Sequence, residues 1–276
     1  MEKMFDPIKE IDHICNWIKE YFVENGPNSH AVLGISGGKD STVAAMLLVK
    51  ALGPDRVCGV MMPDFVQADI DDARMVCEKL NIRSWEIDIG PSVEALYKGL
   101  TECWIDNGFQ KLPGGVTSNT PARIRMTTLY GVAGLVGGRV ANTCNWSEDF
   151  VGYSTKYGDA AGDFGILCHY AVREVITMGC VLAKEFDIPV ELIAKAPSDG
   201  MCGKTDEDNL GFTYDTLDSM LLDGIIPDYE TFRNIMERHK RNTHKTNCIR
   251  LPAPRPLLYR RYQHWGQVEE ERCFEF

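Results

Sequence analysis

Apolar and polar positions alternate along the chain with two different periods, which separate candidate helices from candidate strands. A first helix is predicted between Asp6-Pro7, which begin it, and Gly26-Pro27, which end it. Its apolar residues recur at helical spacing, at Ile8, Ile11, Ile14, Ile18 and Phe22. This amphipathic stretch predicts a helix that packs one side against the body of the protein.

Short apolar runs predict strands at 31–35, 57–62, 84–89 and 139–143. Stretches with helical character are found at 40–52, 68–80, 92–104, 119–137 and 174–186. In the 119–137 stretch we expect Asn119 as N-cap and Pro121 in the first turn. Strands that alternate with helices indicate an α/β fold with a Rossmann-like parallel sheet and helices on both faces. Ligands of such a sheet bind at the carboxyl ends of its strands.

Composition narrows the class of protein. The chain has 276 residues and is 44% hydrophobic, which predicts one domain over residues 1–276, with 242–276 as a C-terminal extension. A net charge of -11 argues against a broad nucleic-acid surface. No apolar run is long enough to span a bilayer and the N-terminus lacks a signal-peptide pattern, so we expect a cytoplasmic protein without a membrane partner. The 10 cysteines form no C-x-x-C pair, and we expect most to be reduced and buried.

A glycine-rich turn links the predicted strand 31–35 to the helix after it. It reads Gly34-Ile35-Ser36-Gly37-Gly38-Lys39-Asp40-Ser41. The amides of such a turn and of the first helical turn point the same way and form a nest for an anion. The spacing is not that of a Walker A loop, and a carboxylate follows the lysine. Because Asp40 would repel a phosphate, it indicates a bridging divalent cation; the alternative is a tight turn that serves packing alone.

Polar residues follow the predicted strand 139–143. Glu148 and Asp159 lie in this run and could join Asp40 in holding Mg²⁺, or they could be helix caps. Arg123 and Arg125 are two residues apart on a predicted helix, so we expect them to have different partners; the alternative is a solvated helix face.

Several motifs together resemble a known family. Ser36-Gly37-Gly38-x-Asp40-Ser41 is similar to the signature of the N-type ATP-pyrophosphatases, whose fold is adenine nucleotide alpha hydrolase-like. The chain also resembles the ammonia-dependent NAD synthetases from its first helix to about Arg241. The motifs that carry this resemblance are Asn119-x-x-x-Arg123-x-Arg125-Met126, Asn142-Thr143-Cys144-Asn145-x-Ser147-Glu148, Ser154-Thr155-Lys156-Tyr157-Gly158-Asp159, Lys195-Ala196-Pro197-Ser198 and Thr205-Asp206-Glu207.

The resemblance implies a ligase reaction, the last step of NAD biosynthesis. ATP adenylates the carboxylate of deamido-NAD with release of pyrophosphate, and ammonia then displaces AMP to give NAD. Mg²⁺ is the implied cofactor, and the family works as a homodimer with deamido-NAD at the subunit boundary. The helices 121–137 and 174–186 are candidate interface elements because their apolar stripes are broad.

The resemblance also implies site residues. Asp40, Glu148 and Asp159 are the implied catalytic residues and Mg²⁺ ligands. The ATP-binding positions are Gly34, Ile35, Ser36, Gly37, Gly38, Lys39, Asp40, Ser41, Thr143 and Ser198. The positions for deamido-NAD are Arg123, Lys156, Asp163, His239 and Lys240. Either Asp159 or Asp163 could accept a proton from the attacking ammonia, and no cysteine nucleophile is needed.

Two departures from the family leave alternatives open. A lysine that contacts ATP in the family falls on Val172, and Arg173 beside it could supply the charge. The segment 197–207 is also shorter than the corresponding segment of the family. One alternative is another ATP-pyrophosphatase, such as a tRNA thiolase or a lysidine synthetase, although the chain lacks their basic face and paired cysteines. The other is a non-catalytic nucleotide-sensing module, which the presence of Asp40, Glu148 and Asp159 opposes.

Overall fold

The sheet is parallel throughout, as predicted. The structure is a computed structural model that describes residues 5–194 and 206–245. The strand order is β3-β2-β1-β4-β5, and every pairing is parallel. The bounds are β1 (His30–Gly34), β2 (Val57–Met61), β3 (Arg83–Glu86), β4 (Gly138–Asn142) and β5 (Phe164–Gly165). The sequence did not predict β5, which is too short to show a period.

The strand order reverses at β1. The chain runs from β1 outward to β2 and β3, then returns to place β4 on the other side of β1. The register pairs Ala31 with Val57 on one side and with Arg139 on the other. Such a reversal opens a crevice at the carboxyl ends of the two central strands. The glycine turn after β1 and the polar run after β4 therefore meet at this edge.

Helices cover both faces of the sheet because successive strand residues point to opposite sides. Ala31 and Leu33 pack into one cluster of buried apolar side chains, while Val32 packs into another. The first face is covered by α1 (Pro7–Asn25), α2 (Lys39–Leu52), α3 (Ile70–Lys79), α7 (Val172–Glu185) and α8 (Val190–Ala194). The second is covered by α4 (Gly90–Asp106) and α5 (Gly114–Val136). A short 3₁₀ helix, Pro54–Arg56, precedes β2.

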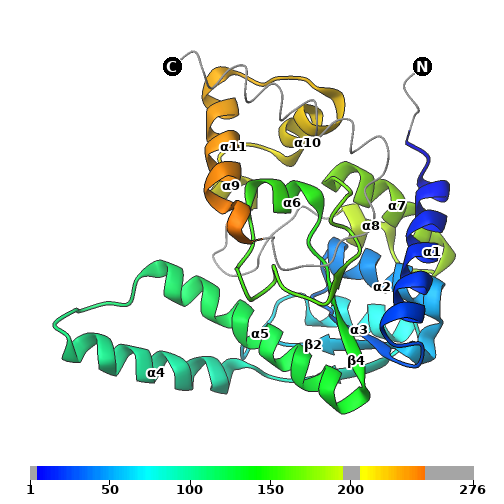
Figure 1. Cartoon of the computed structure of the whole chain (residues 1–276). Coiled ribbons are helices and arrows are strands. Elements are labelled where there is room, and N and C mark those ends of the chain that lie inside the picture. Colours follow the sequence, from blue (N-terminus) through cyan, green and yellow to red (C-terminus); the bar gives the residue numbers. More distant parts are fainter. Residues whose placement is uncertain (1–4, 195–205, 246–276) are drawn as a thin grey trace.

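Helices α4 and α5 extend past the sheet and form an arm on one side of the molecule (Figure 1). We call this pair the α4–α5 arm. The rings of Trp104 and Phe109 stack near its tip with centroids 3.8 Å apart. Its large apolar side chains are exposed at Leu96, Leu100, Ile105 and Phe109.

Helix α5 begins five residues earlier than the sequence predicts. Asn119 is not its N-cap, and Pro121 lies inside the helix. A proline has no N–H for the carbonyl four residues before it. That carbonyl belongs to Thr117 and accepts the Tyr97 hydroxyl from α4 instead, so the helix continues through the proline. The Asn119 side chain accepts a hydrogen bond from Thr155 Oγ1 at 2.7 Å.

A third group of helices packs beside the loop that follows β4. It consists of α6 (Trp146–Val151), α9 (Asp206–Leu210), α10 (Tyr214–Asp223), α11 (Tyr229–Asn242) and the 3₁₀ turn Thr243–Lys245. Asn242 Nδ2 donates to the Val151 carbonyl at 3.1 Å, so the start of the predicted C-terminal extension contacts α6. Residues 246–276 lie outside the described residues. No helix within 5–194 and 206–245 is long and apolar enough to cross a membrane.

Candidate active site

The glycine turn after β1 is a tight βα turn. Gly37 has a φ of +82°, a left-handed conformation that favours glycine. A Cβ at this position would lie 2.6 Å from the Asp69 carbonyl oxygen, so no side chain fits. The Ser36 and Ser41 hydroxyls lie 3.1 Å apart, and Ser36 Oγ accepts from the Gly38 amide at 3.2 Å. The packing role of the glycines is thus real, but it does not exclude a binding role.

Helix α2 begins at Lys39 without a side-chain cap. Its N-cap is Gly38, which has no side chain to accept hydrogen bonds from the first amides of the helix. The Thr42 hydroxyl and the Ser41 hydroxyl instead donate to the Gly38 carbonyl, at 2.8 and 3.1 Å. Amides left without an internal acceptor at a helix start attract anions. The start of α2 therefore offers amides without a side-chain acceptor, and the anion nest stays a prediction.

Charged and polar side chains meet directly at this terminus. Lys39 Nζ lies 2.6 Å from Asp40 Oδ2, and its side chain is 3% exposed. Asn145 Nδ2 donates to the other Asp40 oxygen at 3.1 Å. Asn145 also caps α6, because its side chain accepts from the Glu148 amide while the Glu148 carboxylate accepts from the Asn145 amide. Asp40 and Glu148 are therefore joined through one asparagine, and Glu148 completes the cap of α6.

The protonation of this group is coupled. Burial raises the pKa of Glu148 well above its ordinary value, the negative charge of Asp40 adds to this, and Lys39 opposes it. Burial by itself would lower the pKa of Lys39, but Asp40 and Glu148 outweigh burial and raise it. The favoured state is a buried ammonium that is compensated by neighbouring carboxylates.

Oxygen donors at this point fit a hard divalent cation. Mg²⁺ is bound through one or two carboxylates together with phosphate oxygens and water. The described part of the chain contains no group of three His, Cys, Asp or Glu side chains that could hold a metal by themselves. Asp40 and Glu148 match the usual pair of carboxylates. Asp159 is an exposed residue whose carboxylate accepts from the Thr155 amide at 2.9 Å, and it is not grouped with the other two.

Helix α7 begins differently from α2. Its first amides are already used: Val172 N donates to Ser147 Oγ at 3.1 Å, and Arg173 N donates to Asp218 Oδ2 at 2.7 Å. Val172 is buried among apolar residues of α6 and α10. The Arg173 guanidinium bonds Asp223 at 2.9 Å and Ser219 at 2.9 Å on α10. The Arg173 guanidinium is therefore held by α10, and we expect that Arg173 does not replace the lysine that falls on Val172.

A hollow of about 480 Å³ lies beside the carboxyl end of β4. Its lining residues come from α5 and from the loop before β5: Met126, Thr127, Tyr130, Tyr157, Ala161 and Gly162. The Tyr130 hydroxyl donates to Asp163 Oδ1 at 3.1 Å, and Asp163 Oδ2 accepts from the Val140 amide at 2.7 Å. Asp163 therefore holds one wall of the hollow in place. Tyr157 is 63% exposed and has a φ of 64°, an uncommon conformation for a residue with a side chain.

Two predicted basic residues flank this hollow. Arg123 Nε donates to the Lys156 carbonyl at 3.2 Å, and Lys156 Nζ donates to the His244 carbonyl at 2.8 Å. Arg125 instead donates to the Met62 carbonyl at 3.1 Å. The prediction that the two arginines have different partners is confirmed.

The basic residues at the end of α11 and in the 3₁₀ turn after it have different contacts. His239 stacks on Phe150 with ring centroids 4.2 Å apart, and its Nδ1 lies 2.8 Å from the Phe150 carbonyl oxygen. Lys240 is exposed. Sequence reasoning missed Lys245, whose Nζ donates to the Gly152 and Ser154 carbonyls, each at 2.8 Å. Burial lowers the pKa of Lys245, and the nearby negative charge of Asp159 opposes this.

The remaining predicted positions are placed simply. Thr143 directly follows β4 and is partly exposed, while Ser198 lies outside the described residues. The free cysteines among the described residues are mostly buried, as expected.

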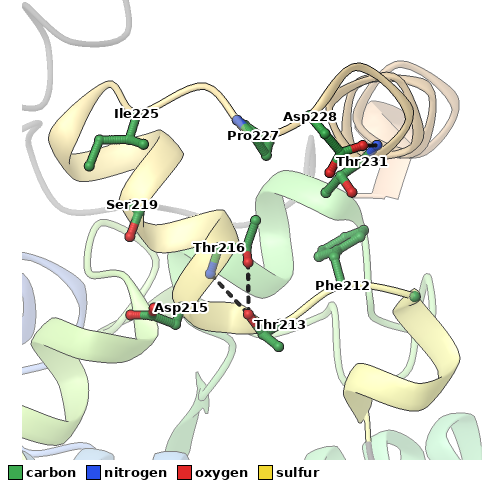
Figure 2. A pocket seen from close by; sticks show the side chains of 10 residues that line it. Phe212, Thr213, Asp215, Thr216, Ser219, Ile225, Pro227, Asp228 and Thr231 are labelled. Atoms are coloured by element: carbon green, nitrogen blue, oxygen red, sulfur yellow. Dashed lines mark hydrogen bonds between the residues drawn. The ribbon is translucent and has the colours of Figure 1, made fainter.

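A second hollow, of about 470 Å³, lies between the starts of α10 and α11 (Figure 2). Thr213 and Thr216 bond each other on one side, and Asp228 accepts from the Thr231 amide on the other. Since these side chains already cap their own helices, the hollow offers few free donors.

A family model for NAD synthase matches residues 10–250. The chain belongs to the NAD synthase family. The NH(3)-dependent NAD(+) synthetase of Thermoplasma acidophilum is 36% identical over 251 residues, which cover 88% of this chain and 97% of the relative. That of Methanocaldococcus jannaschii is 37% identical over 257 residues, covering 88% and 95%. The resemblance read from the sequence is confirmed, and the chain is a carbon–nitrogen ligase by family.

Solved structures of the NAD synthase family share the fold. The NMN synthetase of Francisella tularensis has a TM-score of 0.77 and 33% identity, and the match covers 91% of this chain and 99% of that one. The NH3-dependent NAD synthetase of Campylobacter jejuni has a TM-score of 0.67 and 28% identity, with coverage of 87% and 96%.

Proposed function

We propose that the protein forms NAD from deamido-NAD, ATP and ammonia, with release of AMP and pyrophosphate. The observation that carries the proposal is the joining of Asp40 and Glu148 through Asn145 at the uncapped start of α2. Carboxylates beside an anion nest are what a metal–triphosphate complex requires. The same residues oppose a non-catalytic nucleotide-sensing module, for which loss of these acids would be the signature.

The first step activates the carboxylate of deamido-NAD. A carboxylate is a poor acyl donor because its leaving group would be oxide. Its oxygen attacks the α-phosphorus of ATP, the bond to pyrophosphate breaks, and a mixed anhydride with AMP forms. Two anions approach each other in this step, at a cost of several kcal/mol at a low effective dielectric. The helix start contributes about 0.3–1 kcal/mol against this cost, so cations must supply most of it.

Asp40 and Glu148 would hold Mg²⁺ in this site. When bound, Mg²⁺ neutralises phosphate charge and makes pyrophosphate a better leaving group. A second metal near Asp159 remains a prediction from the family resemblance. Lys39 is the buried cation of the protein itself beside these acids.

The second step is attack by ammonia on the activated carbonyl carbon. A carbon–nitrogen bond forms, AMP leaves, and one proton must be taken from the nitrogen. Both oxygens of Asp163 already accept hydrogen bonds. Asp159 is exposed, and its Oδ1 accepts a hydrogen bond from the Thr155 amide, so we assign the proton to Asp159.

We place deamido-NAD in the hollow beside β4. Tyr157, which is exposed, and Tyr130, whose hydroxyl is bonded to Asp163, offer aromatic faces for a pyridine ring. Arg123 and Lys156 offer positive charge. Lys245 takes the role that the sequence assigned to Lys240, because its ammonium lies near Asp159. His239 then supports the site by packing on α6.

The α4–α5 arm supports a homodimer. Its exposed apolar side chains are a surface that a second copy would cover. Helix α7 does not fit this role, because its apolar residues pack inside against α2 and α8. We further place the protein in the cytoplasm, a setting in which its free cysteines would stay reduced.

The mononucleotide is a second candidate substrate. The Francisella tularensis structure named as NMN synthetase has a higher TM-score, 0.77, than the Campylobacter jejuni NAD synthetase, 0.67. The same adenylation chemistry on nicotinate mononucleotide would give NMN.

Exchange of labelled pyrophosphate into ATP tests the proposal and separates the two substrates. The assay contains protein, Mg²⁺ and ATP without ammonia, so that only the adenylation step runs. We expect exchange when deamido-NAD is added and at least tenfold less with nicotinate mononucleotide. Faster exchange with the mononucleotide would favour the second candidate, and no exchange with either would contradict both.

A further inference from the structure

Lys39 is an unusual residue for the start of a helix. Cations are disfavoured at this end by the helix dipole, and Lys39 is also buried, with 4% of the residue exposed. Its ammonium is held by Asp40 at 2.6 Å and lies 5.9 Å from the centre of the Tyr214 ring. Such a position is stable only because carboxylates surround it.

Tyr214 is the second unusual group at this point. It is 3% exposed, and its hydroxyl makes no hydrogen bond within the described part of the chain. An unsatisfied buried hydroxyl is costly, which indicates a partner that arrives from outside. Burial raises the pKa of Tyr214, and the charges of Glu148, Asp206 and Asp40 raise it further; the same three carboxylates raise the pKa of Lys39.

Lys39 also occupies a carboxylate oxygen of Asp40 that a metal ion would bind. Its ammonium takes one oxygen of Asp40, and Asn145 takes the other. A divalent cation on Asp40 competes with both of them for the carboxylate, and like charge makes the ammonium the group that is repelled. A lysine side chain has a flexible four-carbon stem with which to move.

We propose that Lys39 and Tyr214 form a phosphate-binding pair that works in exchange with the metal. In the ligand-free protein the Lys39 ammonium pairs with Asp40, and the charge of Glu148 also stabilises it. When the divalent cation binds with the nucleotide, the ammonium moves to an anionic oxygen of the triphosphate, and the Tyr214 hydroxyl donates to an oxygen beside it. This inference rests on the proposed function, because it takes ATP as the substrate.

Two binding measurements on the full chain test the exchange. Mn²⁺ binding without nucleotide is followed by electron paramagnetic resonance, and binding of α,β-methylene-ATP with Mg²⁺ is followed by calorimetry. We expect Lys39→Met to bind Mn²⁺ at least tenfold more tightly and the ATP analogue at least tenfold more weakly. Tyr214→Phe should bind Mn²⁺ within twofold of the unsubstituted protein and the analogue three- to tenfold more weakly.

Lys50→Met is the matched control. Lys50 lies on the same helix and pairs with Glu185 at 2.6 Å at the surface. We expect it to change neither affinity. If the melting temperature of Lys39→Met shows that it is not folded, Lys39→Gln repeats the test with a side chain that keeps its polarity.

The outcomes separate this inference from the proposed function. Unchanged or weaker Mn²⁺ binding by both Lys39 variants would overturn the exchange, and unchanged analogue binding by Tyr214→Phe would remove Tyr214 from the pair. If the unsubstituted protein binds no analogue at all, the proposed function fails, and the phosphate half of the inference fails with it.

Discussion

Helices α2 and α7 lie side by side on one face of the sheet, yet their N-termini are built in opposite ways. The first amides of α2 have no side-chain cap and are surrounded by Lys39, Asp40 and Asn145. The first amides of α7 are bonded to Ser147 and Asp218, and apolar side chains fill the space around them. A helix start attracts an anion only where its amides are left without a partner.

We propose that this difference between the two N-termini compensates for the absence of the family lysine, which falls on Val172. Val172 is part of an apolar cluster, and Arg173 is turned toward α10. The positive charge is found at α2, on Lys39. We therefore propose that the positive charge that acts on ATP lies at the start of α2, while the start of α7 has a structural role.

The largest effect is expected from a substitution beside the start of α2. In Glu148→Gln the amide oxygen can still cap α6, but the negative charge for the metal is lost. We expect kcat/KM for NAD formation to fall about 10³-fold, close to 4 kcal/mol of transition-state stabilisation. Burial disfavours the charged carboxyl while Lys39 favours it, so the two effects on the free energy of unfolding oppose each other and the variant should stay folded. A variant that unfolds easily, or one that retains activity, would contradict the assignment.

The next effect concerns Asp149, which lies on α6 between the two termini. Burial raises the pKa of Asp149 to about 7, a bond from the Cys168 thiol lowers it, and the charge of Asp159 raises it. The folded state thus holds a proton that the unfolded chain releases near pH 4. Stability from this group is present at low pH and is lost as pH rises from about 4 to about 7, by up to about 4 kcal/mol.

Urea unfolding of Asp149→Asn between pH 4 and pH 8 checks this sign. The variant should gain stability relative to the unsubstituted protein as pH rises, because asparagine does not ionise. Glu94→Gln, at an exposed position, is the control and should run parallel to the unsubstituted protein. Parallel curves for Asp149→Asn would refute the raised pKa.

Asp218→Ala tests the hydrogen bonds that cap the start of α7. It removes the acceptor of the Arg173 amide and of the Ser147 hydroxyl, which donates to Asp218 Oδ1 at 2.6 Å. We expect the free energy of unfolding to fall by about 2 kcal/mol, because buried donors lose their partner. Asp215→Ala, on the same helix with its side chain exposed, should cost less than about 0.5 kcal/mol. Equal effects in chemical denaturation would show that the α7 cap is unimportant.

The smallest effect is expected for Arg173→Ala. Its guanidinium is about two-fifths exposed and bonds side chains of α10, so the loss of stability should be within about 1 kcal/mol. The KM for ATP should stay within twofold. A tenfold rise of that KM would mean that Arg173 does act on ATP.

Sequence reasoning succeeded where the signal is local. The βα turn at Gly37 and the central strands follow from spacing and from residues with special backbone freedom. It failed where distant segments supply a partner. Pro121 lies inside α5 because Tyr97 bonds the Thr117 carbonyl, and no local rule contains that contact. The link from Asn145 to Asp40 likewise spans 105 residues, so the joining of the two acids could not be read from the chain.

Lys245 shows the same limit within a short motif. The sequence offers several basic residues near the end of α11, and helical spacing does not say which of them contacts the loop after α6. The docking of α11 on α6 decides it, through the contacts of His239 and Asn242.

The most direct test is NAD formation from deamido-NAD, ATP and Mg²⁺, measured with ammonium or glutamine as nitrogen source, in the unsubstituted protein and in Asp40→Ala. We expect NAD with ammonium, none with glutamine, and loss of the activity in Asp40→Ala while the protein stays folded. Absence of NAD with ammonium, or full activity of Asp40→Ala, would contradict the claim that the start of α2 is the catalytic centre.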